Sequence, residues 1–102
     1  MTEGHARQCV LVPHANAEGQ GLQYLTDVPA LADCCSACTA HANCTVFVYC
    51  PASASSGCDD GAGTIYPSSL CALKSYSLRP GQAPKFYSRG PIVPWTSGYT
   101  IS

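Results

Sequence analysis

The cysteine content of this chain limits its fold more than any other feature. Eight cysteines occur in 102 residues, and three of them, Cys34, Cys35 and Cys38, lie within five consecutive positions. Cytosolic thiols stay reduced, whereas small domains in oxidising compartments use disulfides to replace the large core that they cannot build. We therefore expect an extracellular domain, secreted or displayed at the cell surface, that is held together by up to four disulfides.

The composition fits one small domain and excludes two classes of partner. Charged residues make up only 11% of the chain and the formal net charge is −1, so no general electrostatic field attracts nucleic acid or anionic lipid. No stretch of the chain approaches the roughly 20 consecutive apolar residues of a membrane span. We therefore expect no nucleic-acid partner and no membrane insertion.

The N-terminal residues predict a loose end followed by one domain. Residues 1–7 are expected to be flexible and residues 8–102 to form a single domain. Residues 1–5 have neither the basic start nor the apolar run of a signal peptide. If the cysteines are oxidised, the export signal must lie outside this chain, so we expect the domain to be part of a longer secreted protein.

Local patterns predict one helix over residues 27–43. Asp27 can accept hydrogen bonds from the first turn, and Pro29 is tolerated there. Asn43 can take the left-handed conformation that ends a helix. The apolar residues of the predicted stripe, which recur at spacings of three and four, are Leu31, Cys34, Cys35, Cys38 and Ala42.

Runs of alternating, β-branched or aromatic residues predict the strands. The strongest strand pattern covers residues 44–50, which we expect to lie centrally in a sheet. The other predicted strands cover residues 8–12, 22–26, 70–75, 85–88 and 98–101. Loops are predicted at residues 14–21 and 51–69 and a turn at residues 79–84, because these segments are rich in Gly, Pro, Ser and Asp.

The predicted elements suggest partners for some of the cysteines. Cys34 and Cys38 are four residues apart, so on a helix they project from the same face and can point onto a sheet. Cys44 follows after one tight turn and can reach back to Cys38, while Cys71 lies on a later strand as the natural partner of Cys34. Eight cysteines allow on the order of 100 pairings, so spacing alone does not choose among them.

Several spaced motifs together resemble the PAN/apple domain family. They are Asp33-Cys34-x-x-x-Cys38, Cys44, Phe47-x-Tyr49, Cys71-x-Leu73-Lys74 and Ser97-Gly98-Tyr99, and the resemblance runs from about residue 19 to residue 101. The resemblance implies an α+β fold, with a curved antiparallel sheet of about five strands and one helix packed across it. It also implies the disulfides Cys34–Cys71 and Cys38–Cys44, which pin the helix to the sheet.

The chain departs from the apple variant, which ties its two ends with a disulfide, because no cysteine follows Cys71. Cys9 must therefore pair elsewhere or remain free. Cys35 points about 100° away from its neighbour on a helix and can meet the first strand, so we pair Cys9 with Cys35. Cys50 and Cys58 flank a Ser/Gly loop, which we expect them to close.

Zinc is the alternative use of the clustered cysteines. Cys34, Cys35 and Cys38, with His41 or Cys44, can surround a metal ion. Structural zinc sites usually combine two Cys-x2–4-Cys pairs on separate turns, however, and the next two cysteines of this chain are eight residues apart. We therefore expect disulfides, with no metal ion and no cofactor.

The sequence predicts no enzyme. A cysteine nucleophile needs a thiolate and a nearby base, which an oxidised cysteine cannot supply. The chain has no Gly-x-Ser-x-Gly turn, and His14 and His41 are best explained as surface residues. Asp59-Asp60-Gly61 is similar to part of a calcium loop, but it lacks the alternating ligands and distal Glu of an EF-hand, so we expect a hydrophilic turn.

The aromatic residues give the best indication of a binding site. Trp95 lies in an irregular segment, where it is either partly exposed or merely covers one end of the sheet. Flat aromatic side chains beside polar groups suit a sugar ring or a protein partner. The candidate ligand-binding residues are Trp95, Tyr99, Tyr76 and Lys74.

The sequence Asn43-Cys44-Thr45 is a sequon for N-glycosylation. Asn43 therefore has two readings, as a glycan acceptor in a secreted protein or as the residue that ends the helix. A disulfide at Cys44 would hinder the transfer of a glycan, so the sequence leaves both readings open.

The resemblance implies an extracellular, non-catalytic module for adhesion or recognition, whose ligand is a protein or a carbohydrate. One alternative is an architectural module, repeated in a matrix, wall or surface-appendage protein, that contacts the neighbouring domains of a longer parent chain. Another alternative is a protease inhibitor, for which the loop between Cys50 and Cys58 is the only candidate.

Overall fold

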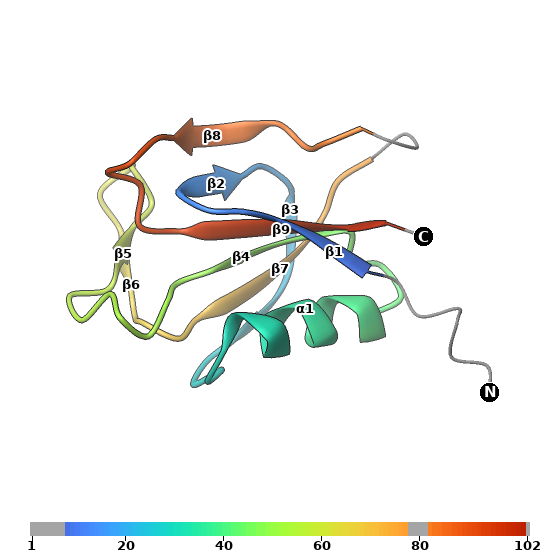
Figure 1. Ribbon diagram of the computed structural model, residues 1–102, viewed down its shortest axis with the longest axis horizontal. Coiled ribbons are helices and arrows are strands. Elements are labelled where there is room, and N and C mark those ends of the chain that lie inside the picture. Colours follow the sequence, from blue (N-terminus) through green and yellow to red (C-terminus); the bar gives the residue numbers. More distant parts are fainter. Residues whose placement is uncertain (1–7, 78–81, 102) are drawn as a thin grey trace.

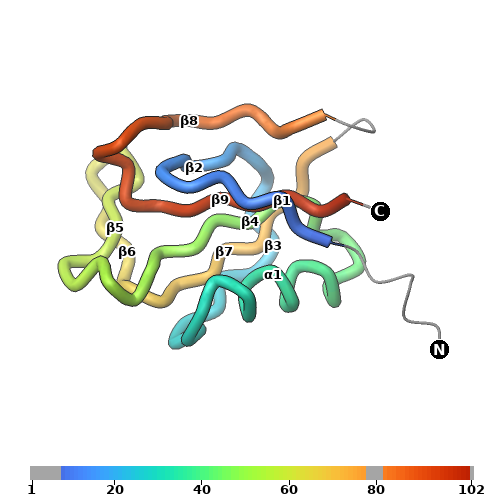
Figure 2. Tube along the Cα trace, in the orientation of Figure 1, coloured from blue at the N-terminus to red at the C-terminus, as the bar shows by residue number. Residues whose placement is uncertain are grey.

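The computed structural model describes residues 8–77 and 82–101. Its largest element is a five-stranded antiparallel sheet. The strands follow one another across this sheet in the order β1 (Gln8–Val12), β9 (Thr96–Ile101), β4 (Val46–Tyr49), β7 (Cys71–Ser75) and β3 (Gln20–Leu25). One helix, α1 (Leu31–Ala40), lies along one face of this sheet, and a two-stranded ribbon lies on the other side (Figures 1 and 2). The α+β fold predicted from the sequence is confirmed. The flexible end predicted at residues 1–7 and the first half of the turn predicted at 79–84 lie outside the described residues.

Two further pairs form separate small sheets: β2 (Ala15–Ala17) with β8 (Phe86–Arg89), and β5 (Cys58–Asp59) with β6 (Ile65–Tyr66). The predicted strands occur within about two residues of their expected ends. The loops predicted at residues 14–21 and 51–69 are wrong, because they contain β2, the start of β3, β5 and β6.

The two central strands are buried on both faces, which gives the domain two cores. Along β4, Phe47 packs toward α1, whereas Val46 and Val48 pack toward the ribbon of β2 and β8. Along β7, Leu73 packs toward α1 and Ala72 toward the ribbon. Strands buried on both faces are expected to be apolar throughout, which explains the continuous apolar run of β4.

The helix begins four residues later than the sequence predicts. Its N-cap is Ala30, whose side chain makes no capping hydrogen bond, and Asp27 instead has a left-handed backbone with φ of 58°. Val28 donates its N–H to the carbonyl of Ser69 at 2.9 Å, so it belongs to the approach to the helix. Because the ring of Pro29 keeps the preceding residue out of the α region, a helix cannot run through this point.

The helix also ends earlier than predicted. His41 is extended, with φ of −92° and ψ of 125°, and its N–H bonds to the carbonyl of Cys38 at 3.1 Å. The prediction that Asn43 ends the helix is wrong, because Asn43 does not have the positive φ that this role requires. The disulfide from Cys38 to Cys44 closes this turn, which leaves no room for a further helical turn.

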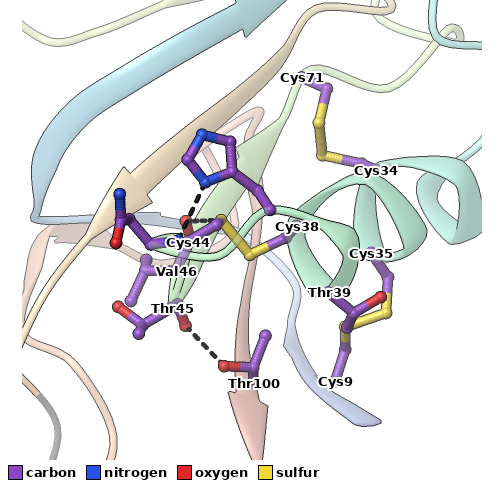
Figure 3. The surroundings of a disulfide bond; sticks show 12 residues. Cys9, Cys34, Cys35, Cys38, Thr39, Cys44, Thr45, Val46, Cys71 and Thr100 are labelled. Atoms are coloured by element: carbon purple, nitrogen blue, oxygen red, sulfur yellow. Dashed lines mark hydrogen bonds between the residues drawn. A yellow bond between two sulfur atoms is a disulfide. The ribbon is translucent and has the colours of Figure 1, made fainter. Parts of the chain in front are cut away.

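The structure contains the four disulfides that the sequence analysis expects: Cys9–Cys35, Cys34–Cys71, Cys38–Cys44 and Cys50–Cys58. The first three leave α1 in different directions, toward β1, β7 and the turn before β4 (Figure 3). The helix is therefore fixed to the sheet at three points.

The two ends of the described chain meet in the main sheet. β1 pairs with β9 over five residues, from Gln8 opposite Ile101 to Val12 opposite Ser97. Backbone hydrogen bonds thus hold the two described ends together, and the disulfide from Cys9 to Cys35 fixes β1 to the helix. In apple domains a disulfide joins the two ends directly.

The pair Ser97-Gly98 in β9 has a packing role on both faces of the sheet. The buried Ser97 hydroxyl donates to the carbonyl of Ala15 at 2.6 Å and accepts the N–H of Ala17 at 2.9 Å, which ties the sheet to β2. On the helix side, the ring of Phe47 lies directly against Gly98, where any Cβ would overlap it. A larger residue at either position would displace one of the two layers.

The uncapped start of α1 leads to a stability prediction. We expect Ala30→Asp to raise the free energy of unfolding by roughly 1 kcal/mol, because Ala30 is exposed, is extended and lacks a capping side chain. Urea unfolding measures this change. Ala32→Asp, two residues further on, is the control: it adds the same charge to the first turn but no capping oxygen, so it should give a smaller gain. Equal effects of both changes would contradict the assignment of the cap.

Candidate ligand-binding cavity

One open cavity of about 570 Å³ lies on the ribbon side of the main sheet. Its volume is within the range of small-ligand sites, roughly 300–1,000 Å³. It is bounded by the sheet, the ribbon of β2 and β8, and the β5–β6 hairpin. The residues that line it are Asn16, Gly19, Tyr24, Val48, Asp60, Gly61, Ala62, Tyr66, Ala72, Lys74, Tyr87, Ser88 and Trp95.

Trp95 is buried at one end of the cavity, with 3% of its surface exposed. Its indole Nε1 donates a hydrogen bond to the backbone carbonyl of Asp59 at 2.9 Å. Of the two readings of Trp95, partial exposure is therefore wrong, and the reading that it covers one end of the sheet agrees with its position. The β5–β6 hairpin packs over the indole, which accounts for this burial.

A row of aromatic rings runs from the cavity wall to its rim. The rings of Tyr66 and Trp95 meet edge to face at 5.7 Å, and those of Tyr24 and Tyr66 are stacked at 6.4 Å. Tyr24 is 53% exposed, so its ring faces solvent at the rim. Desolvation, with smaller contributions from Tyr24 and Asp60, raises the pKa of Tyr66 above its ordinary value, so its hydroxyl stays protonated and can donate a hydrogen bond.

Lys74 brings a positive charge into the cavity wall. Only 8% of its surface is exposed, and its Nζ donates to the carbonyl of Ala17 at 2.7 Å. The ring of Tyr87 lies 5.5 Å from the ammonium group, within reach of a cation–π interaction. Burial lowers the pKa of Lys74, and the nearby charge of Glu18 opposes this shift.

The turn between β5 and β6 places a carboxylate at the cavity. Asp60 accepts the N–H groups of Ala62 and Thr64 on Oδ1 at 2.7 and 3.2 Å. Asp59 accepts the N–H of Gly61 in the same way at 2.7 Å. These side chains organise the hydrophilic turn that the sequence predicts, and in the described part of the chain Asp60 forms no ion pair with Lys74.

The cavity contains two of the four candidate ligand-binding residues. Lys74 and Trp95 line it, whereas Tyr76 and Tyr99 pack at the edge of the same core without lining the cavity. The sequence analysis did not select the other polar and aromatic lining residues: Asn16, Tyr24, Asp60, Tyr66, Tyr87 and Ser88. Aromatic character is the one local signal for Tyr24, Tyr66 and Tyr87. The chain fold alone brings these residues into one cavity, because they come from segments far apart in the sequence.

The structure describes no metal-binding cluster. All eight cysteines are in disulfides, so those of the zinc alternative offer no thiolate. Within residues 8–77 and 82–101, no three His, Cys, Asp or Glu side chains gather in a way that could hold a metal ion. Over the same residues, no helix has the length and apolar character needed to cross a bilayer.

Comparison with protein families identifies the class of this chain. A family model of the PAN domain matches residues 15–74, more than half of the sequence, so the chain belongs to the PAN domain family. Comparisons with curated proteins and with solved structures gave no match. PAN domains are disulfide-rich, non-catalytic modules that typically bind protein or carbohydrate, although they can be part of a catalytic parent protein. A disulfide-rich PAN domain indicates an extracellular or secretory-pathway location.

The buried ammonium group of Lys74 leads to a pH prediction. Because folding lowers its pKa, the unfolded chain binds more protons between this lowered pKa and the ordinary value of 10.5. The wild type should therefore gain stability relative to Lys74→Met as the pH rises through this interval, and the gain should stop above it. Urea unfolding of both proteins measures the difference, with the exposed Lys85→Met as control. A difference that stays constant or falls would contradict the burial of a charged Lys74.

Proposed function

We propose that this chain is an extracellular, non-catalytic recognition module, displayed as part of a longer secreted or cell-surface protein, that binds carbohydrate in the cavity. The observation that carries the proposal is the combination of solvent-facing aromatic rings with hydrogen-bonding groups around one open cavity of about 570 Å³. A cavity of this size accommodates one or two sugar rings, and its open side allows a longer glycan to continue into solvent.

The aromatic rim suits the apolar face of a sugar. Tyr24 and Tyr87 are 53% and 63% exposed, so their rings are available to a ligand without unfolding any part of the domain. A pyranose ring presents C–H groups on its faces and hydroxyls at its edge, and a flat aromatic ring packs against the former. Exposed tyrosines beside a cavity are therefore a better match for a sugar than for a fully apolar molecule.

The polar groups of the cavity suit the hydroxyls of a sugar. Lys74 and Asn16 can donate hydrogen bonds, Asp60 can accept them, and Ser88, which pairs with Asn16 across the ribbon, can do both. The two ionised side chains have opposite signs, so the cavity carries no net charge. This balance favours a neutral, hydroxyl-rich ligand over a strongly charged one.

The position of the cavity supports recognition over a purely architectural role. Trp95 lies just before the start of β9, whereas the described ends of the chain meet at the opposite end of β9, where Gln8 pairs with Ile101. In Figure 1, the β5–β6 hairpin accordingly lies at the opposite end of the molecule from the start of β1 and the end of β9. Neighbouring domains joined at these ends would leave the cavity open to external ligands.

The loop between Cys50 and Cys58 gives little support to protease inhibition. Two successive turns fold it, with the N–H of Ala54 bonded to the carbonyl of Pro51 at 3.0 Å and that of Gly57 to Ala54 at 2.8 Å. An inhibitory loop has to present an extended segment that can pair with the protease backbone. A loop made of closed turns lacks such a segment.

Asn43 is proposed as a glycan acceptor. It is exposed in the turn between α1 and β4, and the helix-ending role that competes with glycosylation is excluded. The neighbouring Thr45 accepts the N–H of Thr100 and donates its own N–H to the carbonyl of Lys74, both at 3.0 Å, so this turn is fixed to β9 and β7. Secretion from a eukaryotic host followed by enzymatic deglycosylation tests this; a mass that does not change would refute it.

The carbohydrate proposal predicts a specific loss of binding. We expect Tyr24→Ala and Tyr87→Ala each to weaken binding of the best glycoside roughly five- to tenfold, because each removes one ring face worth about 1 kcal/mol. A panel of methyl glycosides, followed by NMR titration of the amide signals, identifies this probe and measures its affinity. Leu11→Ala, an exposed apolar change on β1 at the other edge of the sheet, is the matched control and should have no effect.

The same titration separates the alternatives. Shifts confined to the cavity residues support the proposal. No shift with any glycoside, together with a glycan array that stays silent, would contradict it. Silence combined with binding of the domain to neighbouring parts of its parent chain would favour the architectural role.

A further inference from the structure

The four disulfides divide between the two cores of the domain. Six cysteines pack on the helix side of the sheet, where their three disulfides hold α1. Cys50 and Cys58 instead belong to the core on the other side, together with Val48, Ala72 and Trp95. These last three residues line the cavity. The fourth disulfide is thus the one in the half of the molecule that forms the proposed ligand site.

The β5–β6 hairpin makes one wall of the cavity but has little stability of its own. Residues 60–62 and Tyr66, all from this hairpin or its turn, line the cavity. Each of its strands has only two residues, and only two residue pairs join them. A two-stranded hairpin is at best marginally stable in water even when it is longer, so this wall depends on contacts outside the hairpin.

One disulfide and three non-covalent contacts hold the hairpin to the rest of the domain. The disulfide joins Cys58, the first residue of β5, to Cys50, the residue after β4, with 5.9 Å between their Cα atoms. The indole of Trp95 bonds to the carbonyl of Asp59, the next residue of β5. The ring of Tyr66 packs edge to face on the same indole and stacks on the ring of Tyr24 in β3. Only the disulfide is covalent.

We propose that the Cys50–Cys58 disulfide is a positioning element of the cavity: it fixes the β5–β6 hairpin in its binding conformation and is not needed for the α1–sheet core. The inference rests on the proposed function, since it assumes that the cavity binds a ligand. Without the disulfide, the hairpin would sample many conformations, and a ligand would have to order it again on binding. The same disorder would uncover Trp95, whose burial depends on the hairpin.

The test compares two disulfides of similar span on opposite faces of the sheet. Cys50 and Cys58 are separated by 8 positions and Cys38 and Cys44 by 6, so the loss of either bond should have a similar effect on the unfolded chain. Cys50→Ala/Cys58→Ala should keep the native far-UV circular dichroism and the other three disulfides. It should lose roughly fivefold or more in affinity for the best methyl glycoside. Cys38→Ala/Cys44→Ala should be less stable but, where folded, should bind as the wild type does.

Trp95 provides a readout that needs no ligand. It is the only tryptophan of the chain, so its fluorescence reports on the surroundings of one indole, on which the hairpin packs. In Cys50→Ala/Cys58→Ala its emission should shift to longer wavelength and be quenched more strongly by acrylamide. In Cys38→Ala/Cys44→Ala neither should change. Unchanged emission and unchanged affinity in the first variant, or equal losses in both, would overturn the inference.

A second variant covers the case in which the double substitution prevents folding. Gly57 has φ of +82°, and an added Cβ would overlap the carbonyl of Tyr66, so Gly57→Ala should displace the hairpin with all four disulfides intact. Gly63→Ala is the matched control, because Gly63 lies in the same hairpin with φ of +97° and has open space around it. Gly57→Ala alone should shift the Trp95 emission and weaken binding.

If wild type binds no glycoside while the fluorescence results hold, the proposed function fails but the positioning role remains.

Discussion

The attachment of one short helix to the sheet by three disulfides supports the rest of this structure. α1 has only ten residues and no capping side chain at its start, so its own helical preference is weak. In the chain-entropy model, closing the loops Cys38–Cys44 and Cys34–Cys71 contributes about 2 and 4 kcal/mol respectively. The net stability of a small domain is about 5–15 kcal/mol. The free energy that these disulfides contribute is therefore comparable to the net stability of the whole domain. A chain with 11% charged residues can form few ion pairs to replace that contribution.

Once the helix covers one face of the sheet, the other face becomes available for a second layer and a ligand. β4 and β7 carry apolar residues on both faces, and Ser97 and Lys74 each bond to the backbone of β2. The ribbon of β2 and β8 covers only part of this face, and the β5–β6 hairpin closes one end of the space that remains. The cavity thus lies where two short, weakly paired elements meet a rigid sheet, which is a suitable arrangement for a recognition site on a stable module.

The sequence predicts the helix side of the molecule much better than the ligand side. Three sequence features mark positions that are buried in the structure: the cysteine spacing, the apolar run of β4 and the motif Cys71-x-Leu73-Lys74. The cysteines and apolar residues of these features pack in one or the other of the two cores. β2 could not be predicted, because its three small residues show no strand pattern and its partner β8 lies about 70 residues later. The cavity combines residues from six separate segments, so only the folded chain brings them together. α1 begins later than the capping tendency of Asp27 predicts, because the effect of Pro29 on the residue before it outweighs that tendency.

The central claim is that four specific disulfides divide between a structural core and a ligand-binding half. Peptide mapping by mass spectrometry of the unreduced protein, unfolded in the presence of a thiol-alkylating reagent, tests it most directly. We expect no alkylated cysteine and four cross-linked peptides, which join Cys9 to Cys35, Cys34 to Cys71, Cys38 to Cys44 and Cys50 to Cys58. Alkylation of the cysteines before reduction, or a peptide that joins Cys50 or Cys58 to a cysteine of the helix, would contradict the account.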